Sequence, residues 1–248
     1  MNQFTIYPLH LGTINRECSN MIYRTNPGVK VDFPLVAYFI TDGQQKILFD
    51  TGAFVPENCY VPAGKPNGPY IQKEEQRLDN ALKAIGVNCE DIHTVILSHL
   101  HWDHAGSCHF FPNATFIVQE IEYEYALHPI KIHQFPYRRE EFEGLNFKFV
   151  NGDVELEDGL KLILTPGHTP GSQTLLVNTK EGIYALVSDL VNTRECWESD
   201  PKLANGYHTD LLVHYQSFDK VAAITNRILE GHEIKVFEHK CYPYETDA

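Results

Sequence analysis

Four side chains that can bind a metal ion lie within six residues of one another, at His99, His101, Asp103 and His104. They follow the apolar run 94–98, which the sequence predicts as a buried strand. Neutral imidazoles and carboxylates crowded together are good ligands for Zn²⁺ and similar divalent ions. Without a cation, these groups would have no evident compensation for the water they lose on burial. The H-x-H-x-D-H pattern therefore favours a metal site over a solvated turn.

Three later positions have the same context. Each candidate ligand follows a predicted apolar strand: His168 after 161–165, Asp189 after 183–188 and His239 after 234–237. Ligands gathered at the same ends of several strands can form one rigid site. Glycines flank His168 and allow the backbone to approach closely there. His232 competes with His239, but it follows a predicted helix, so we expect it at the surface.

The elements that must position these residues form a mixture of strands and helices. Apolar runs bounded by turn residues predict strands at 33–40, 46–50, 94–98, 115–119, 147–150, 161–165, 172–178, 183–188 and 234–237. Helical spacing of apolar residues predicts helices at 75–85 and 219–229, and 120–127 is also expected to be helical. No linker interrupts them. The order of elements indicates two sheets covered by helices in a single domain, residues 1–248.

Composition argues against several classes of partner. The 248 residues carry a formal net charge of −13, whereas nucleic acids and anionic membranes attract clustered Lys and Arg. No apolar run approaches the roughly 20 residues that span a bilayer, and the N-terminus lacks the features of a signal peptide. We therefore expect a cytoplasmic protein with no nucleic-acid or membrane partner. Its six scattered cysteines are expected to be unpaired thiols.

The motif H-L-H-W-D-H, with G-H-T-P-G, S-D and E-H further along the chain, resembles the metallo-β-lactamase superfamily. Within it, the chain is similar to the N-acyl-homoserine lactonases over nearly its whole length. The resemblance implies an α+β fold, the αβ/βα sandwich of two mixed sheets flanked by helices, as a single metallo-β-lactamase-fold domain. It also implies two divalent metal ions, usually Zn²⁺.

The resemblance further implies a role for each candidate ligand. His99, His101 and His168 would hold one metal; Asp103, His104 and His239 would hold the second; Asp189 would bridge both; and Asp50 would support the site from nearby. The D-T-G at 50–52 is also found in aspartic proteases, but those need two such motifs and this chain has one.

The implied reaction is the opening of a lactone ring, above all that of N-acyl-homoserine lactones (quorum quenching), by attack of a metal-bridging hydroxide. Asp103 would deliver a proton to the leaving ring oxygen. The lactonases carry a tyrosine three residues after the bridging aspartate. Asn192 stands there in this chain, and we expect its shorter amide to contact substrate and assist the oxyanion.

We expect substrate selectivity to come from segments 58–70 and 129–139 and from residues after Asn192. Trp102 stands where relatives often have Phe, and either lines the pocket or packs in the core. Six further aromatic residues are candidates for an apolar pocket wall: Tyr60, Tyr70, Phe135, Tyr137, Trp197 and Tyr207.

Other functions stay open at this point. Asn192 raises the alternative of a different small lactone, ester or thioester as substrate, in the manner of glyoxalase II. Flavodiiron relatives normally have a carboxylate where His101 stands, so hydrolysis is favoured over redox chemistry. A metal sensor without catalysis is the alternative from another class. The expected partner is a small-molecule lactone, and the sequence is compatible with a homodimer.

Overall fold

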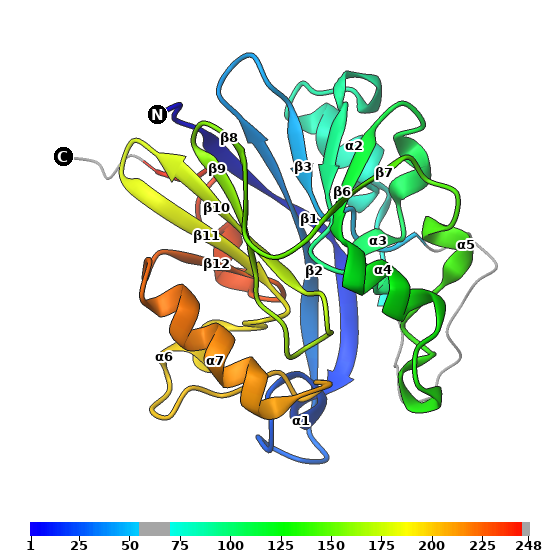
Figure 1. Ribbon diagram of the computed structural model, residues 1–248, viewed down its shortest axis with the longest axis vertical. Helices are drawn as coiled ribbons and strands as arrows, with labels where there is room; N and C mark the ends of the chain where they lie inside the picture. The colour runs from blue at the N-terminus through cyan, green and yellow to red at the C-terminus, as the bar shows by residue number, and fades with distance from the viewer. Residues whose placement is uncertain (55–69, 245–248) are drawn as a thin grey trace.

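Two β-sheets lie side by side through the middle of the molecule in the computed structural model, with helices on both outer sides (Figure 1). The structure describes residues 1–54 and 70–244. The larger sheet has seven strands in the order β4 (Tyr70–Ile71), β1 (Thr5–Glu17), β2 (Lys30–Thr41), β3 (Ile47–Phe49), β5 (Thr94–Ile96), β6 (Thr115–Gln119) and β7 (Phe147–Val150). The smaller has five, in the order β12 (Ile228–Glu230), β11 (Gly182–Ser188), β10 (Gln173–Thr179), β9 (Leu160–Leu164) and β8 (Val154–Glu157).

Both sheets are mixed. In the larger sheet β1, β2 and β3 pair antiparallel, and β3, β5, β6 and β7 then run parallel. In the smaller sheet only β11 and β12 pair in parallel. The predicted sandwich of two mixed sheets flanked by helices is therefore confirmed.

Side chains of alternate residues sort onto the two faces of each sheet, as the period of two along a strand requires. On β2, Val36, Tyr38 and Ile40 belong to the apolar cluster between the sheets. Their neighbours Leu35, Ala37 and Phe39 belong to the cluster beneath the helices. Both faces of the central strands are thus buried. This explains why these segments read as continuous apolar runs and not as alternating ones.

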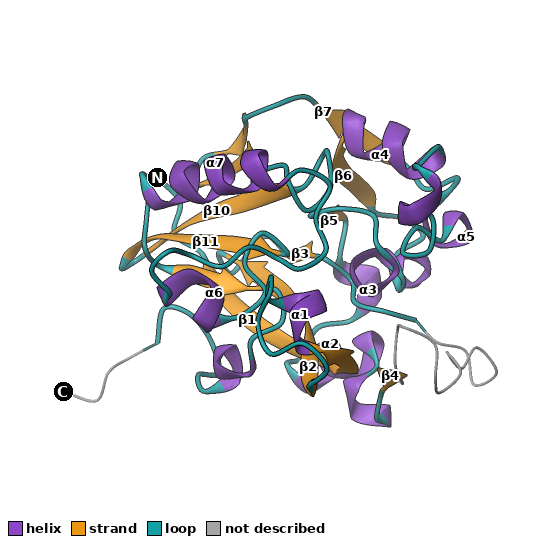
Figure 2. Cartoon of the chain, turned by 90° about the horizontal axis from the view of Figure 1, so that it is seen from below, coloured by secondary structure: helices purple, strands orange, loops and turns teal. Residues whose placement is uncertain are grey.

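Seven α-helices connect and cover the strands: α1 (Cys18–Met21), α2 (Leu78–Ala84), α3 (Trp102–Ala105), α4 (Glu120–Leu127), α5 (Arg139–Phe142), α6 (Arg194–Glu198) and α7 (Leu211–Ala222), all within the described ranges. Figure 2 shows α7 lying across β10 and β11, and α4 beside β6 and β7 on the other side. Within residues 1–54 and 70–244, no helix has both the length and the apolar character that crossing a membrane requires.

The prediction for the last third of the chain was partly wrong. The helix expected at 219–229 is α7, which begins earlier because the Asp210 side chain caps it by accepting a hydrogen bond from the Val213 amide at 3.0 Å. Ile228 and Leu229 pair with β11, so this apolar pair forms strand β12. The strand expected at 234–237 is a 3₁₀ helix, Ile234–Phe237. The long N-terminal strand β1 was not predicted.

Loss of packing between the sheets should destabilise the fold. Leu175 on β10 is fully buried there, so Leu175→Ala should lower the free energy of unfolding by about 2–5 kcal/mol, because it removes apolar contacts and leaves a cavity. The same change at Leu212, which is 76% exposed on α7, should alter it by less than about 0.5 kcal/mol. Urea denaturation of both variants measures the difference; equal losses would contradict this account of the core.

Candidate metal centre

The candidate ligands come together because each follows the end of a strand. His99 and His101 lie in the turn after β5, and His168 lies in the loop between β9 and β10. Asp189 directly follows β11, and His232 comes two residues after β12. All five side chains are buried.

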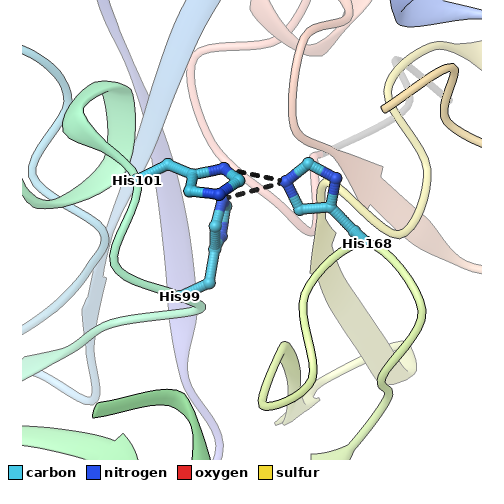
Figure 3. A group of neighbouring side chains, drawn as sticks. All are labelled: His99, His101 and His168. Atoms are coloured by element: carbon cyan, nitrogen blue, oxygen red, sulfur yellow. Dashed lines mark hydrogen bonds between the residues drawn. The ribbon is translucent and has the colours of Figure 1, made fainter. Parts of the chain in front are cut away.

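Three imidazoles form the first group. His168 Nε2 lies 3.2 Å from His99 Nε2 and 3.1 Å from His101 Nδ1. Figure 3 shows the three rings pointing toward one another, with His99 and His101 reaching the site from one loop and His168 from another. Three ring nitrogens therefore converge from two segments almost 70 residues apart in sequence.

Asp189 joins this group to a second one. Its Oδ1 lies 3.1 Å from both His104 Nε2 and His232 Nε2, and its Oδ2 lies 3.3 Å from His168 Nε2. The ligand atoms of Asp103, His104 and His232 also lie within 4.8 Å of one another. Asp189 thus has the position of a bridge between two ligand groups.

The outward-facing nitrogen of four of these histidines is held by a hydrogen bond, which fixes the ring and turns its other nitrogen inward. The partners are the Ser98 hydroxyl for His99 (2.9 Å), the Asp50 carboxylate for His104 (2.9 Å), the Tyr207 carbonyl for His168 (2.7 Å) and the Pro34 carbonyl for His232 (2.8 Å). Such partners are typical of histidines that bind metals.

Asp50 supports the centre from the end of β3. Besides His104, it accepts hydrogen bonds from the Ser98 amide at 2.7 Å, the Ser98 hydroxyl at 2.8 Å and the Ser188 hydroxyl at 3.1 Å. Asp50 and Ser188 both have positive φ, 61° and 46°, an uncommon conformation for these residue types. One carboxylate thereby ties together the ends of β3, β5 and β11.

The charges of the cluster shift the pKa of its members. Burial, reinforced by neighbouring imidazoles, lowers the pKa of His99 and of His101 well below the usual range. Burial would also lower the pKa of His104, but the Asp189 and Asp50 carboxylates raise it above that range. Burial would raise the pKa of Asp189, but His232, His104 and His168 hold it well below its usual value. The surrounding imidazoles therefore favour the ionised form of Asp189, which is the form that binds a cation.

The donor set fits two divalent cations. Three buried atoms, His104 Nε2, His232 Nε2 and Asp189 Oδ1, make no hydrogen bond, because their contacts with one another at 3.1 Å lack hydrogen-bond geometry. Buried polar atoms are rarely left unpaired in this way, and here they converge. Imidazole nitrogens and carboxylate oxygens in groups of three suit Zn²⁺ and similar ions.

Glu122 holds the two ligand loops against each other, a role that the sequence did not reveal. This buried residue of α4 accepts hydrogen bonds from the Leu100 amide at 3.1 Å and from the Gly171 amide at 3.0 Å. Leu100 separates His99 from His101, and Gly171 belongs to the His168 loop. Burial raises the pKa of Glu122, although these hydrogen bonds oppose the shift.

His239 does not lie in the cluster, and the expectation that it binds metal is corrected. Its ring stacks on Tyr244, with centroids 3.4 Å apart. The reason is that the last strand of the smaller sheet is β12 and not the expected strand at 234–237. His232 is therefore the histidine that follows the last strand, and the 3₁₀ helix separates His239 from it. His232, expected at the surface, is only 2% exposed.

Asn192 is buried behind the site, where its amide is already engaged. Its Nδ2 donates to the Met21 carbonyl at 2.8 Å, and its Oδ1 accepts from Asn205 at 2.9 Å. Its own carbonyl accepts from the His232 amide at 2.8 Å. The expected contact with substrate is therefore corrected to a supporting role beneath the His232 loop.

A cavity of about 750 Å³ opens beside the cluster. Five ligand residues reach it: His101, Asp103, His168, Asp189 and His232. The rest of its wall is mostly apolar: Ile14, Met21, Trp102, Ile132, Phe135 and Pro136, together with Arg16, Asn20, Asn205, Gly206 and Tyr207. Trp102 thus lines the cavity while being almost fully buried.

Four of the other aromatic candidates lie in or next to the wall of this cavity. Phe135 and Tyr207 line it. Tyr70 packs edge-to-face on Trp102, and Tyr137 packs on His101. Trp197 packs on Phe218 of α7 instead. Tyr60 and most of the expected substrate segment 58–70 lie outside the described residues.

The sequence matches a known protein family and is similar to known lactonases. A family model described as the metallo-beta-lactamase superfamily matches residues 32–229. An N-acyl homoserine lactonase from a Bacillus species is 36% identical over 215 residues, 83% of each chain. The N-acyl homoserine lactonase AiiA of Bacillus thuringiensis subsp. kurstaki is 32% identical over 248 residues, 93% of each chain.

The fold is likewise similar to that of solved lactonases. An N-acyl homoserine lactone hydrolase with the product N-hexanoyl-L-homoserine bound at its catalytic metal center is 31% identical to this chain, with a TM-score of 0.80 over 96% of both chains.

Metal analysis should distinguish His232 from His239. His232→Ala removes a ligand of the second group, so its metal content should fall to about half that of the wild type, because the first group keeps its three imidazoles. His239→Ala should retain the full content. Elemental analysis of the dialysed proteins measures both. A full metal content in His232→Ala, or a loss in His239→Ala, would contradict the assignment.

Proposed function

We propose that this chain, which belongs to the metallo-beta-lactamase superfamily, opens the lactone ring of N-acyl-homoserine lactones and so quenches quorum signals. One observation carries the proposal: the two ligand groups face a cavity with an apolar wall. An N-acyl-homoserine lactone matches this arrangement, because it has a polar, hydrolysable ring at one end and an apolar acyl chain at the other. Support also comes from the solved relative that holds N-hexanoyl-L-homoserine at its metal center.

The cavity is large enough for such a molecule. Its volume of about 750 Å³ falls within the roughly 300–1,000 Å³ of typical ligand sites. Ile132 and Phe135 are largely exposed on the surface as well as lining the cavity. They lie in the 129–139 segment expected to govern selectivity. An acyl chain that covers these side chains would gain binding energy from burial of apolar surface.

We propose Zn²⁺ as the native ion, because the donors are imidazoles and carboxylates in groups of three. Two such ions supply Lewis acidity, which polarises an ester carbonyl and lowers the pKa of a water molecule. His99, His101 and His168 would hold one ion. Asp103, His104 and His232 would hold the other, and Asp189 would contact both.

The protein's own residues then orient the ester and move one proton. In the net reaction, the oxygen of water bonds to the carbonyl carbon and the ring carbon–oxygen bond breaks. One proton of the water must reach the ring oxygen, which leaves as a hydroxyl group. Asp103 faces the cavity next to His104 and His232, and it is the carboxylate placed to carry that proton.

A substrate panel tests the proposed function. The zinc-loaded protein should hydrolyse N-acyl-homoserine lactones, with kcat/KM increasing with acyl length as the chain covers more of the apolar wall. Ring opening yields a carboxylic acid, so proton release with a pH indicator follows the reaction. Short γ- and δ-lactones and a thioester serve as comparison substrates. Faster hydrolysis of the thioester or of an acyl-free lactone would contradict the assignment.

Replacement of Asp103 tests the proton transfer. Asp103→Asn keeps an oxygen donor but cannot carry a proton, so kcat should fall by about 100-fold or more. KM should change much less, because the cavity wall is intact. Steady-state kinetics with metal content measured in the same sample provides the comparison. An unchanged kcat in a metal-replete variant would remove Asp103 from the mechanism.

A further inference from the structure

Tyr207, a residue that lines the cavity, carries a hydrogen-bond donor that the protein does not use. Its hydroxyl oxygen is buried and has no hydrogen-bond partner, although the residue lines the cavity beside the ligand groups. A buried hydroxyl without a partner is destabilising, so such a group calls for an explanation. A ligand that supplies an oxygen would provide the missing partner.

The ring of Tyr207 lies against the first ligand group. Its centroid is 5.5 Å from that of His101 and 5.7 Å from that of His168, with interplanar angles of 81° and 59°. The ring also packs on His133, with centroids 5.3 Å apart. These contacts fix the phenol beside the imidazoles without using its hydroxyl.

The backbone of Tyr207 is tied to the same cluster on both sides. Its carbonyl accepts the hydrogen bond from His168 Nδ1 at 2.7 Å. Its amide donates to Asn205 Oδ1 at 2.8 Å, and Asn205 Nδ2 in turn donates to the Asp189 carbonyl at 3.1 Å. The position of Tyr207 is therefore coupled to the positions of His168 and Asp189.

We propose that the Tyr207 hydroxyl donates a hydrogen bond to the carbonyl oxygen of the ester under attack. Negative charge grows on that oxygen as water adds to the carbonyl carbon, so a donor placed there acts mainly in the transition state. Asn192 is not available for this role, because its amide is bound to Met21 and Asn205. The inference rests on the lactonase function proposed above, and it makes Tyr207 a catalytic residue.

Tyr207→Phe tests the proposal, with Tyr125→Phe as the matched control. Tyr125 lies in the same aromatic cluster, but its hydroxyl is bonded to His133 Nδ1 at 2.7 Å. Tyr207→Phe should lower kcat on an N-acyl-homoserine lactone by about 100-fold, as loss of one oxyanion donor does elsewhere. Its metal content and melting temperature should match the wild type, since no hydrogen bond within the protein is lost. Tyr125→Phe should keep its kcat within about twofold, with an equal or lower melting temperature.

Two outcomes would overturn the assignment: a kcat for Tyr207→Phe within about twofold of the wild type, or a rise in KM alone, which would place the hydroxyl on a remote part of the substrate. Calorimetric binding of the ring-opened product N-hexanoyl-L-homoserine provides a readout independent of turnover. Its dissociation constant should rise about tenfold in Tyr207→Phe, because the carboxylate loses a donor.

The binding measurement also separates this inference from the proposed function. If the wild type hydrolyses no lactone, the proposed function fails, and a tenfold weaker binding of product by Tyr207→Phe would still support the hydroxyl as a carbonyl-oxygen donor. Equal binding by the two proteins, or no binding by the wild type, would overturn it.

Discussion

The buried carboxylate of Asp189, with three imidazoles around it, is the arrangement on which the structure of the site depends. A carboxylate removed from water is costly unless cations or hydrogen bonds compensate it. Here His104, His168 and His232 all approach within 3.3 Å, and they arrive from three different strand ends. The imidazoles and the carboxylate compensate one another only in part, because the contacts of His104 Nε2 and His232 Nε2 with Asp189 are not hydrogen bonds. A pair of cations would satisfy these atoms at once.

The sandwich makes this convergence possible by bringing the ends of strands from both sheets together. Close approach then requires residues without side chains. A Cβ atom on Gly231 would lie 2.9 Å from Asp189 Oδ1, and one on Gly171 would collide with Glu122. Gly167 has a φ of +133°, which side-chain-bearing residues rarely adopt. The glycines therefore let the His168 and His232 loops reach the centre, while Glu122 holds the His168 loop from behind and Asp50 holds His104.

A feature of the fold or of the site could be predicted from the sequence where the residues that determine it lie close together in the chain. The H-x-H-x-D-H turn and His168 carry their signal in a few neighbouring residues, and the structure brings them together. His232 was missed because the apolar residues of 219–229 fit helical spacing, whereas Ile228 and Leu229 form a strand only through pairing with β11. Asn192 was misjudged because its partners, Met21 and Asn205, are defined by the folded structure alone. Glu122, within an acidic helix, gave no sign that it would be buried.

The most direct test of the central claim is a crystal structure of the protein grown with zinc, with data collected on both sides of the zinc absorption edge. The account predicts anomalous density for two ions a few ångströms apart. One should contact His99, His101 and His168, the other Asp103, His104 and His232, and both should contact Asp189. A single ion, or a His232 side chain turned away from the second position, would contradict it.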